Sequence, residues 1–384
     1  MLKKLSFFVL FFTVPVFAQE VTNRNVLQQN PLRSFGDSAH VAFMGGSITE
    51  MDGYRPMVCE MLQKRFPATK FTFTAAGISS TCSMTGAFRL ERDVLSKGKV
   101  DLFFVEFAVN DDQDAHHSEQ TAIRGMEGIV RHVRHHNPDA DIIITFFANE
   151  HLMDEYRHGR EATSITAHRK VAEFYHIPTI NVAREVQQQI DEEKLTWQQF
   201  GGVHPAPYGN RIAANMIEYV FTPKLDELTD ERGRTARRRQ LDPYNYENGR
   251  FVSPDTAKYG NAWTWSVPDW KSIPGGFRST FSGQKLLCCN QPDEELTFEF
   301  DGKAVGAFIL AGPDAGVVEY QIDGKPAGQV VLFHNFSTGL HYPRTVMFDD
   351  QLEPGKHVLR LKITGIVPPK SKGTAARILQ FAVN

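Results

Sequence analysis

The sequence has few of the features that mark several protein classes. Only four of its 384 residues are cysteine, and they form neither a Cys-x-x-Cys pair nor a cluster with histidine, so we expect no structural metal. A formal net charge of −3 lacks the basic excess of a dedicated nucleic-acid-binding protein. Beyond the N-terminus no apolar run is long enough to span a bilayer. These absences indicate an ordinary globular chain, long enough for two domains.

The four cysteines leave the disulfide state open. An oxidising compartment would allow a bridge between Cys59 and Cys82. Cys288 and Cys289 are neighbours in the chain, and a disulfide between adjacent residues is strained.

The N-terminus has the pattern of a signal peptide. Lys3 and Lys4 precede an apolar run over residues 5–17, and Ala18 ends a stretch that suits a cleavage site. The run is too short to span a bilayer comfortably, which disfavours an uncleaved anchor. We therefore expect residues 1–18 to be removed and residues 19–39 to be a lead-in. The mature protein is then periplasmic or extracellular, with no stable membrane insertion.

Residues 40–222 alternate between strand-like and helix-like patterns. The strands are expected at 41–44, 71–74, 102–107, 142–147 and 179–182, and the helices from Pro56 and over 123–133, 167–175 and 208–220. Nearly continuous apolar strands separated by helices are typical of a parallel sheet covered on both faces. The pattern predicts an α/β domain of this kind.

The alternation stops after residue 222. Pro223 ends the last helix, and five arginines lie between Arg232 and Arg239. So short a charge run indicates a solvated surface more often than a polyanion-binding patch. We predict a linker over residues 223–249.

Residues 250–384 have the pattern of β-strands. Apolar and polar residues alternate over 296–300, 318–322 and 359–363, and Asp323-Gly324 marks a hairpin. The pattern predicts a second, all-β domain built as a β-sandwich.

Four positions after predicted strands carry residues suited to acyl transfer. Ser47 follows two glycines after the first strand, Gly77 follows the second, and Asn110 follows the third. His204 lies between Gly and Pro residues in a loop before the last helix. Parallel strands end at one edge of a sheet, which is where open α/β sheets bind ligands. Each position alone is equally typical of a turn, so the hypothesis depends on their order.

This order resembles the four sequence blocks of the SGNH hydrolase superfamily, also called GDSL-like esterases. The resemblance covers roughly residues 40–221 and implies a three-layer α/β/α sandwich. It implies that Ser47 is a nucleophile and His204 its base. It also implies an oxyanion hole formed by the amides of Ser47 and Gly77 and the side chain of Asn110. No metal or organic cofactor is expected.

The chain departs from the superfamily pattern at three positions. Gly46 replaces the usual Asp after the first Gly, and Ala108 replaces a Gly before the Asn. Gly201 stands where an Asp three residues before the His usually completes the triad. The His still needs a partner that fixes its tautomer. That partner is then a backbone carbonyl or an acid from elsewhere. Glu50, Asp52, Glu106 and Asp111 are the candidates, either to orient the His or to contact the substrate.

The predicted second domain bears on the substrate. Residues 250–384 resemble, less specifically, the jelly-roll-like β-sandwiches appended to many carbohydrate-active enzymes. Trp263, Trp265 and Trp270 near its start suit packing better than sugar stacking, since Trp buries a large area. Export and this resemblance together predict removal of an acyl group, most plausibly acetate, from a glycan ester. The sequence does not predict the oligomeric state.

Three other functions stay open. A lipase or thioesterase would use the same residues on longer acyl chains. The missing Asp before His204 also suits a non-catalytic glycan-binding protein. Glu106 with Asp111 or Asp112 would form a carboxylate pair for glycosidic cleavage.

Overall fold

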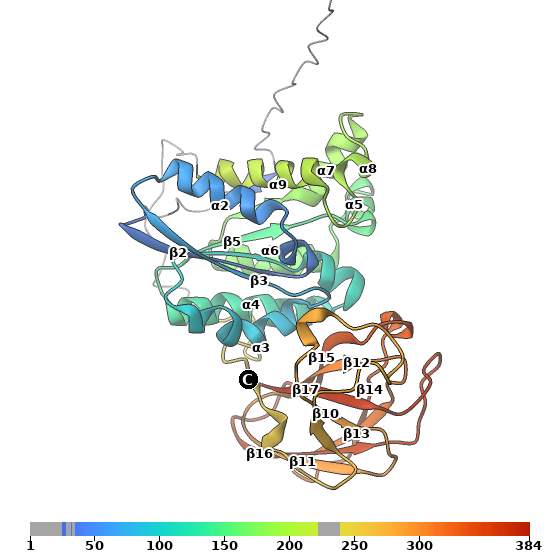
Figure 1. Cartoon of the computed structure of the whole chain (residues 1–384). Helices are drawn as coiled ribbons and strands as arrows, with labels where there is room; N and C mark the ends of the chain where they lie inside the picture. The colour runs from blue at the N-terminus through green and yellow to red at the C-terminus, as the bar shows by residue number, and fades with distance from the viewer. Residues whose placement is uncertain (1–24, 28–31, 33–34, 222–238) are drawn as a thin grey trace, which may run out of the picture.

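The computed structural model describes residues 25–27, 32, 35–221 and 239–384. It shows an N-terminal part of helices around a central sheet and a C-terminal part of strands (Figure 1). The predicted signal peptide and most of the arginine run lie outside the described residues.

A six-stranded sheet forms the centre of the N-terminal part, with strand order β1-β6-β5-β4-β2-β3. Strands β2 to β6 are mutually parallel, and the short β1 runs antiparallel to β6 at one edge. The strands are β1 (Val26–Leu27), β2 (Ser38–Gly45), β3 (Lys70–Gly77), β4 (Leu102–Glu106), β5 (Asp141–Phe146) and β6 (Thr179–Asn181). The predicted parallel sheet is confirmed, with one antiparallel edge strand added.

Helices cover both faces of this sheet. The α-helices are α1 (Ser47–Glu50), α2 (Tyr54–Arg65), α3 (Ser83–Asp93), α4 (Glu119–His136), α5 (Glu150–Arg157), α6 (Thr163–Phe174), α7 (Val182–Asp191), α8 (Trp197–Phe200) and α9 (Pro207–Val220). A 3-10 turn, η1 (Leu95–Lys97), and a π-helical turn, η2 (Asn110–Asp114), interrupt the loops. Helices α2, α9 and α7 lie on one side of the sheet, and α3 and α4 lie on the other (Figure 1). The three-layer sandwich is confirmed.

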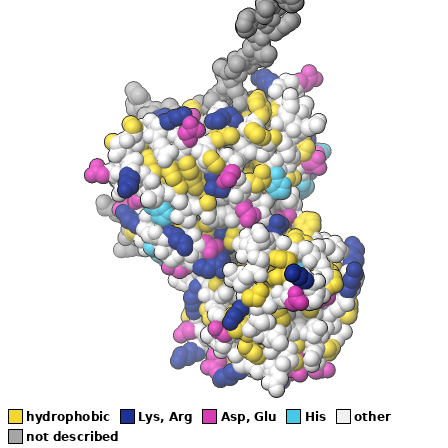
Figure 2. Space-filling model, in the orientation of Figure 1, with side chains coloured by type: hydrophobic (Ala, Val, Ile, Leu, Met, Phe, Trp, Pro, Cys, Tyr) yellow, Lys and Arg dark blue, Asp and Glu magenta, His cyan; other side chains and the backbone are white. Residues whose placement is uncertain are grey.

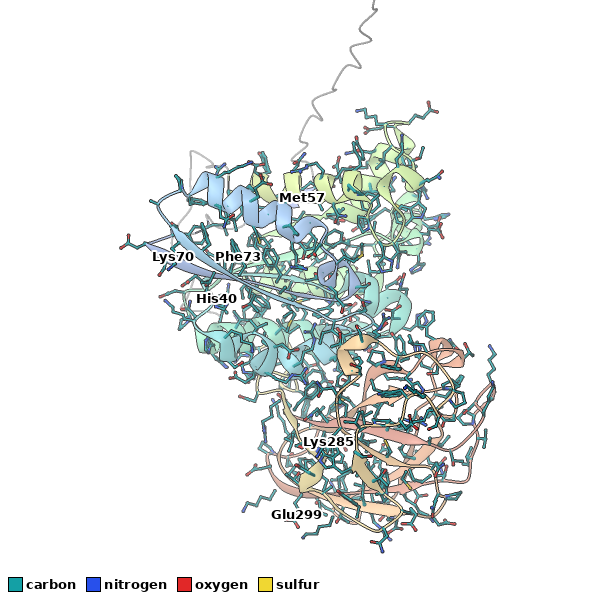
Figure 3. All side chains as sticks on the ribbon, viewed as in Figure 1. His40, Met57, Lys70, Phe73, Lys285 and Glu299 are labelled. Carbon is teal, nitrogen blue, oxygen red and sulfur yellow. The ribbon has the colours of Figure 1, made fainter. Side chains whose placement is uncertain are left out.

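The strand interiors explain why both faces are covered. All five residues of β4 are buried, as are the last five of β2. Phe43 and Phe104 stack between neighbouring strands with ring centroids 4.8 Å apart. The edge strand β3 is less buried, and Lys70 and Phe73 lie on it while Met57 lies on α2 (Figure 3). Apolar residues on both sides of the central strands need a helix layer on each face.

Two antiparallel sheets form the C-terminal part and enclose an apolar core. One has the order β15-β12-β17-β10-β9, with β7 paired to β17, and the other has the order β14-β13-β16-β11-β8. The strands are β7 (Arg250–Val252), β8 (Lys258–Tyr259), β9 (Thr264–Ser266), β10 (Leu286–Cys289), β11 (Glu295–Gly302), β12 (Val305–Ala311), β13 (Val317–Ile322), β14 (Gly328–Val331), β15 (Tyr342–Asp349), β16 (Gly355–Ile363) and β17 (Ala376–Val383). Short 3-10 turns are η3 (Pro254–Thr256), η4 (Ser279–Phe281) and η5 (Asn335–Thr338). This arrangement confirms the predicted β-sandwich.

Local signals in the sandwich also hold. Asp323 and Gly324, both with positive φ, connect the paired strands β13 and β14. Trp263 is buried in the core, and Trp270 stacks on Phe277 with ring centroids 4.5 Å apart. The prediction that these tryptophans pack is therefore confirmed.

The cysteines are all free thiols, so a disulfide between Cys59 and Cys82 is not formed. Cys59 lies on α2, whereas Cys82 is the residue before α3.

Residues 239–249 differ from the predicted solvated linker. Tyr246 and Asn245 are fully buried in this stretch. Glu127 of α4 accepts hydrogen bonds from the backbone amides of Leu241 and Asp242, at 2.7 and 2.9 Å. These contacts form because buried backbone amides need acceptors. The stretch is thus a strap fixed to α4, and this part of the linker prediction is wrong.

The strap also joins the two parts of the chain. Nε of Arg124 lies 3.0 Å from Asp242 of the strap, and Nη1 lies 2.6 Å from Asp350 after β15. The hydroxyl of Tyr246 donates to the same Asp350 oxygen at 2.9 Å. Because the Arg124 side chain is only 5% exposed, this ion-paired contact is well shielded from water.

The surface in view carries charges of both signs. Lysine, arginine, aspartate and glutamate side chains interleave over both parts, as Figure 2 shows. Among the described residues, every helix is too short or too polar to cross a bilayer.

Glu127→Ala should lower the free energy of unfolding by about 2–4 kcal/mol. It removes the acceptor of two buried backbone amides and of the Tyr175 hydroxyl, which donates to Glu127 at 2.6 Å. Urea unfolding measures the change. Glu60→Ala, which removes an exposed partner of Lys64, is the control and should leave the free energy of unfolding nearly unchanged. Equal effects of the two substitutions would contradict the strap's role.

Candidate active site

Ser47 and His204 meet at the carboxyl edge of the parallel sheet. Ser47 begins α1 directly after β2, and His204 lies in the loop between α8 and α9. Nε2 of His204 lies 2.8 Å from Oγ of Ser47. The structure therefore brings together the two side chains that the sequence predicts as nucleophile and base, at hydrogen-bonding distance.

The loop that carries His204 has no room for the missing acid. Gly201 has φ +108°, a conformation that favours glycine. A Cβ at this position would lie 2.0 Å from the backbone nitrogen of Ala206, which donates to the carbonyl of Phe200 at 2.8 Å. Any side chain at 201 would therefore require a different loop. The departure from the superfamily pattern at this position is a property of the backbone.

Asn110 lies beside the turn that presents Ser47. A Cβ on Gly46 would fall 2.1 Å from Oδ1 of Asn110, so only glycine lets the amide come so close. Nδ2 of Asn110 donates to Asp114 at 2.7 Å, which uses one of its two hydrogens and fixes the side chain. The structure thus explains Gly46, the first departure from the superfamily pattern.

Gly77 lies at the end of β3, opposite Gly45 in the parallel register. A Cβ here would lie 2.1 Å from the backbone nitrogen of Glu50. Glycine is therefore needed for α1 to pack against β3. This close packing places Gly77 against the turn of Ser47, next to the other predicted oxyanion residues.

Glu106 lies beneath the Ser47 turn and is 1% exposed. Its Oε1 accepts hydrogen bonds from the Gly46 amide at 3.0 Å and from the Thr49 hydroxyl at 2.6 Å. Burial raises the pKa of Glu106 to about 7, although the bonds from Thr49 and Gly46 oppose this. Its Oε2 has no hydrogen-bond partner among the described residues. The carboxylate clamps the turn from below.

Arg89, a residue that the sequence did not single out, holds the strand ends. Its guanidinium is fully buried and donates to the carbonyl of Gly45 at 2.9 Å and of Ala76 at 2.7 Å. Gly45 is the last residue of β2, and Ala76 is the last but one of β3. An arginine on an amphipathic helix looks like a surface residue in sequence, so nothing marked it.

The acids predicted as partners of His204 are engaged elsewhere. Glu50 accepts from the amide and hydroxyl of Ser79, and the exposed Asp52 pairs with Arg55 at 3.2 Å. Glu106 is committed to Gly46 and Thr49, as described above. Ser47 is the only hydrogen-bond partner of His204 within the described residues. None of the three orients His204, so that part of the prediction is wrong.

Asp111, the fourth candidate, is engaged by other side chains as well. It is fully buried, and Oδ2 accepts from Nε2 of His168 at 2.9 Å. Another neighbour is His117, whose Nδ1 lies 3.4 Å from Oδ1. Despite burial, His117 and His168 hold the pKa of Asp111 well below its usual range. The burial of Asp111 and Glu106 also opposes their use as a carboxylate pair on a sugar.

Comparisons with known proteins agree with this fold. Residues 35–212 match the GDSL-like lipase/acylhydrolase family. No curated protein matches the chain. A two-domain esterase active on acetylated mannans, solved alone and with mannopentaose, is 19% identical over 91% of both chains, with TM-scores of 0.69 and 0.68. A variant of an acetylxylan esterase from Geobacillus stearothermophilus is 18% identical over 49% of this chain and 96% of its own, with a TM-score of 0.40.

The buried Glu106 should make stability depend on pH. Its pKa is about 7 in the fold against a usual 4.5, so between these values the unfolded chain ionises and the folded one does not. Stability should therefore fall as pH rises from about 4.5 to 7, by up to about 3 kcal/mol from this residue, and stay lowered above it.

Urea unfolding of the wild type and Glu106→Gln across this pH range measures the effect. The glutamine keeps an acceptor for Gly46 and Thr49 but does not titrate. As the pH rises from about 4.5 to 7, the unfolding free energy of the wild type should fall relative to that of Glu106→Gln. A difference that stays constant with pH would show that Glu106 is ionised throughout.

Proposed function

We propose, from the match of residues 35–212 to the GDSL-like lipase/acylhydrolase family, that this carboxylic ester hydrolase removes acetyl groups from a carbohydrate by a Ser47–His204 mechanism. The observation that carries the proposal is the 2.8 Å contact between His204 Nε2 and Ser47 Oγ. A serine hydroxyl needs an adjacent base to become a nucleophile, and this geometry supplies one.

The steps follow from the positions of the side chains. His204 takes the proton of Ser47 as Oγ attacks the ester carbonyl, and the tetrahedral intermediate carries an oxyanion. The amides of Ser47 and Gly77 and the free N–H of Asn110 stabilise that charge. His204 then gives its proton to the leaving sugar hydroxyl. Water, activated by the same imidazole, releases acetate from the acyl-enzyme and restores Ser47.

His204 acts in this mechanism without an acid behind it. Its ring is exposed, and Gly201 excludes a carboxylate from the usual place. The imidazolium formed during attack is then stabilised by solvent, and the rigid Gly201–Ala206 turn supplies the orientation. The pair is a dyad.

The substrate class is proposed from the whole chain. The likeness to the esterase active on acetylated mannans covers both the α/β part and the β-sandwich. An acetylated polysaccharide, with mannan as the first to test, therefore suits this chain better than a lipid ester. The signal-peptide pattern of residues 1–18 supports the same proposal, because an exported enzyme can reach polysaccharides that lie outside the cytoplasm.

Ser47→Ala and His204→Ala should each lower kcat for a nitrophenyl acetate by about 10³-fold or more, because each removes half of the dyad. Initial rates with purified protein measure this. Ser96→Ala and His158→Ala change an exposed serine and an exposed histidine outside the site, and should keep wild-type rates. Full turnover by Ser47→Ala would disprove the mechanism, and no hydrolysis by the wild type would favour a non-catalytic glycan-binding protein.

The acyl and glycan preferences are tested separately. A series of nitrophenyl esters should show acetate hydrolysed fastest, with rates falling as the acyl chain lengthens. Acetate released from acetylated mannan, xylan and pectin identifies the glycan. A preference for long acyl chains would overturn the proposal in favour of a lipase or thioesterase.

A further inference from the structure

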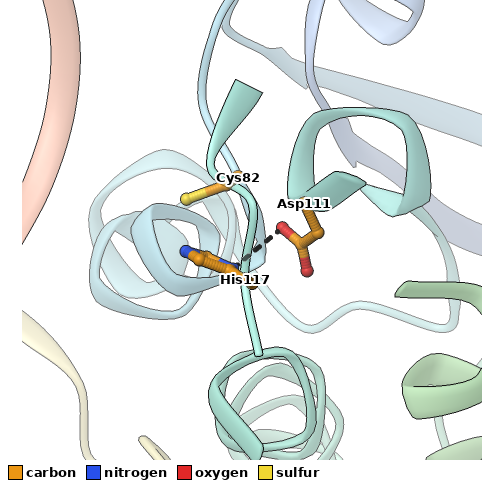
Figure 4. Close-up of side chains that lie close together, drawn as sticks. All are labelled: Cys82, Asp111 and His117. Carbon is orange, nitrogen blue, oxygen red and sulfur yellow. Dashed lines mark ion pairs between the residues drawn. The ribbon is translucent and has the colours of Figure 1, made fainter. Parts of the chain in front are cut away.

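A second cluster of reactive side chains includes Asp111, the residue that follows Asn110. Cys82 precedes α3, Asp111 belongs to η2, and His117 lies in the loop before α4. One potential ligand atom from each lies within 4.8 Å of the other two (Figure 4). Cys82 lies far from Asp111 and His117 in the sequence, so no motif marked the group. The expectation of no cysteine–histidine cluster is therefore wrong.

The separation of two of these atoms suits a metal better than a hydrogen bond. Nδ1 of His117 lies 3.4 Å from Oδ1 of Asp111 and has no hydrogen-bond partner among the described residues. Zinc bound to nitrogen and oxygen at about 2.0–2.1 Å in a tetrahedron separates two ligands by about 3.3–3.4 Å. The His117 side chain is only 10% exposed, so this nitrogen, which is ion-paired with Asp111 but makes no hydrogen bond to the described residues, is held inside the protein.

The carboxylate is already oriented by its own hydrogen bonds. Oδ1 of Asp111 accepts from the Ser83 amide at 2.8 Å, and Oδ2 accepts from the Ser83 hydroxyl at 2.6 Å and from His168 at 2.9 Å. Carboxylates that bind metals are commonly held by such outer contacts, which fix their direction. Oδ1 keeps a lone pair for the side that faces His117.

A cavity gives an ion a way in and room for a water ligand. Its volume is about 240 Å³, and Cys82 and His117 line it together with Tyr342 and Arg344 of the sandwich. Three protein ligands with one solvent position is a common zinc arrangement. Zinc with one thiolate, one carboxylate and a neutral imidazole has no net charge, which removes the penalty of burying an unpaired ion.

We propose that Cys82, Asp111 and His117 bind one zinc ion, with water from the cavity as fourth ligand. Binding forms three bonds to the protein and releases to solvent the thiol proton and any proton on the imidazole. Asp111 directly follows Asn110, so the ion ties η2 to the start of α3 and to the loop before α4. The site is independent of the chemistry proposed for Ser47.

The first test measures zinc content. Tag-free protein is equilibrated with Zn²⁺, dialysed against metal-free buffer and analysed by mass spectrometry for metal per chain. The wild type should retain one zinc, and Cys82→Ser and His117→Ala should retain less than a tenth of that. Cys59→Ser and His132→Ala, which change a half-buried thiol and histidine elsewhere, should retain one. No zinc in the wild type, or equal zinc in all five proteins, would overturn the proposal.

The second test identifies the ligands. With Co²⁺ in place of Zn²⁺, the wild type should show a thiolate-to-cobalt charge-transfer band and the strong visible bands of a tetrahedral ion. Cys82→Ser should lose the charge-transfer band. A spectrum of weak octahedral bands, the same in both proteins, would overturn the assignment of Cys82.

The third test avoids variants that fail to fold. Chelator treatment of the wild type should lower its thermal midpoint, and Zn²⁺ but not Mg²⁺ should restore it, because Mg²⁺ prefers oxygen ligands. An unchanged midpoint would leave His117 as a simple ion-pair partner of Asp111 and refute the site. Ser47→Ala should bind zinc like the wild type even if the proposed hydrolysis proves wrong, so the two proposals fail separately.

Discussion

The position of Ser47 depends on a carboxylate buried beneath it. Glu106 accepts hydrogen bonds from the backbone amide of Gly46 and from the hydroxyl of Thr49. The Thr49 hydroxyl in turn lies 2.9 Å from the hydroxyl of Tyr54. Arg89 donates hydrogen bonds to the backbone carbonyls of Gly45 and Ala76, near the ends of β2 and β3. A buried glutamate and a buried arginine thus fix the backbone around the turn. Removing either partner would strand buried polar groups, which is far more destabilising than losing a surface pair.

Glycines set how closely the parts of the site approach. Gly46 lets Asn110 reach the Ser47 turn, and Gly77 lets α1 pack on β3. Gly201 does something different, because its left-handed conformation and the close approach of Ala206 leave no room for the Asp of the superfamily pattern. The departures from the superfamily pattern at 46 and 201 therefore have a steric cause. They shape the site as much as the residues that take part in the chemistry.

Patterns with a short period could be predicted from the sequence, and contacts between distant segments could not. Apolar strands such as 102–106 indicated the parallel sheet, and the order of Ser47, Asn110 and His204 indicated the site. Residues 239–249 looked like a linker because their anchors, Glu127 and Arg124, lie on α4 more than a hundred positions earlier. Arg89 and the cluster of Cys82 and His117 were missed for the same reason. Only the fold brings their partners together.

The sandwich has one feature that bears on how the chain is made. Strand β17 is the last strand in chain order, yet it lies inside its sheet between β12 and β10 and also pairs with β7. During synthesis β7, β10 and β12 leave the ribosome before β17, so their edges that pair with β17 stay unpaired until it is made. The α/β part has all its strands by residue 181 and can form while the sandwich is still incomplete. Closure of the sandwich, and with it the contact of Asp350 with Arg124, is then the final step of folding. A chain that ends before residue 376 would carry a folded α/β domain followed by an incomplete sheet, whose unpaired strand edges favour aggregation.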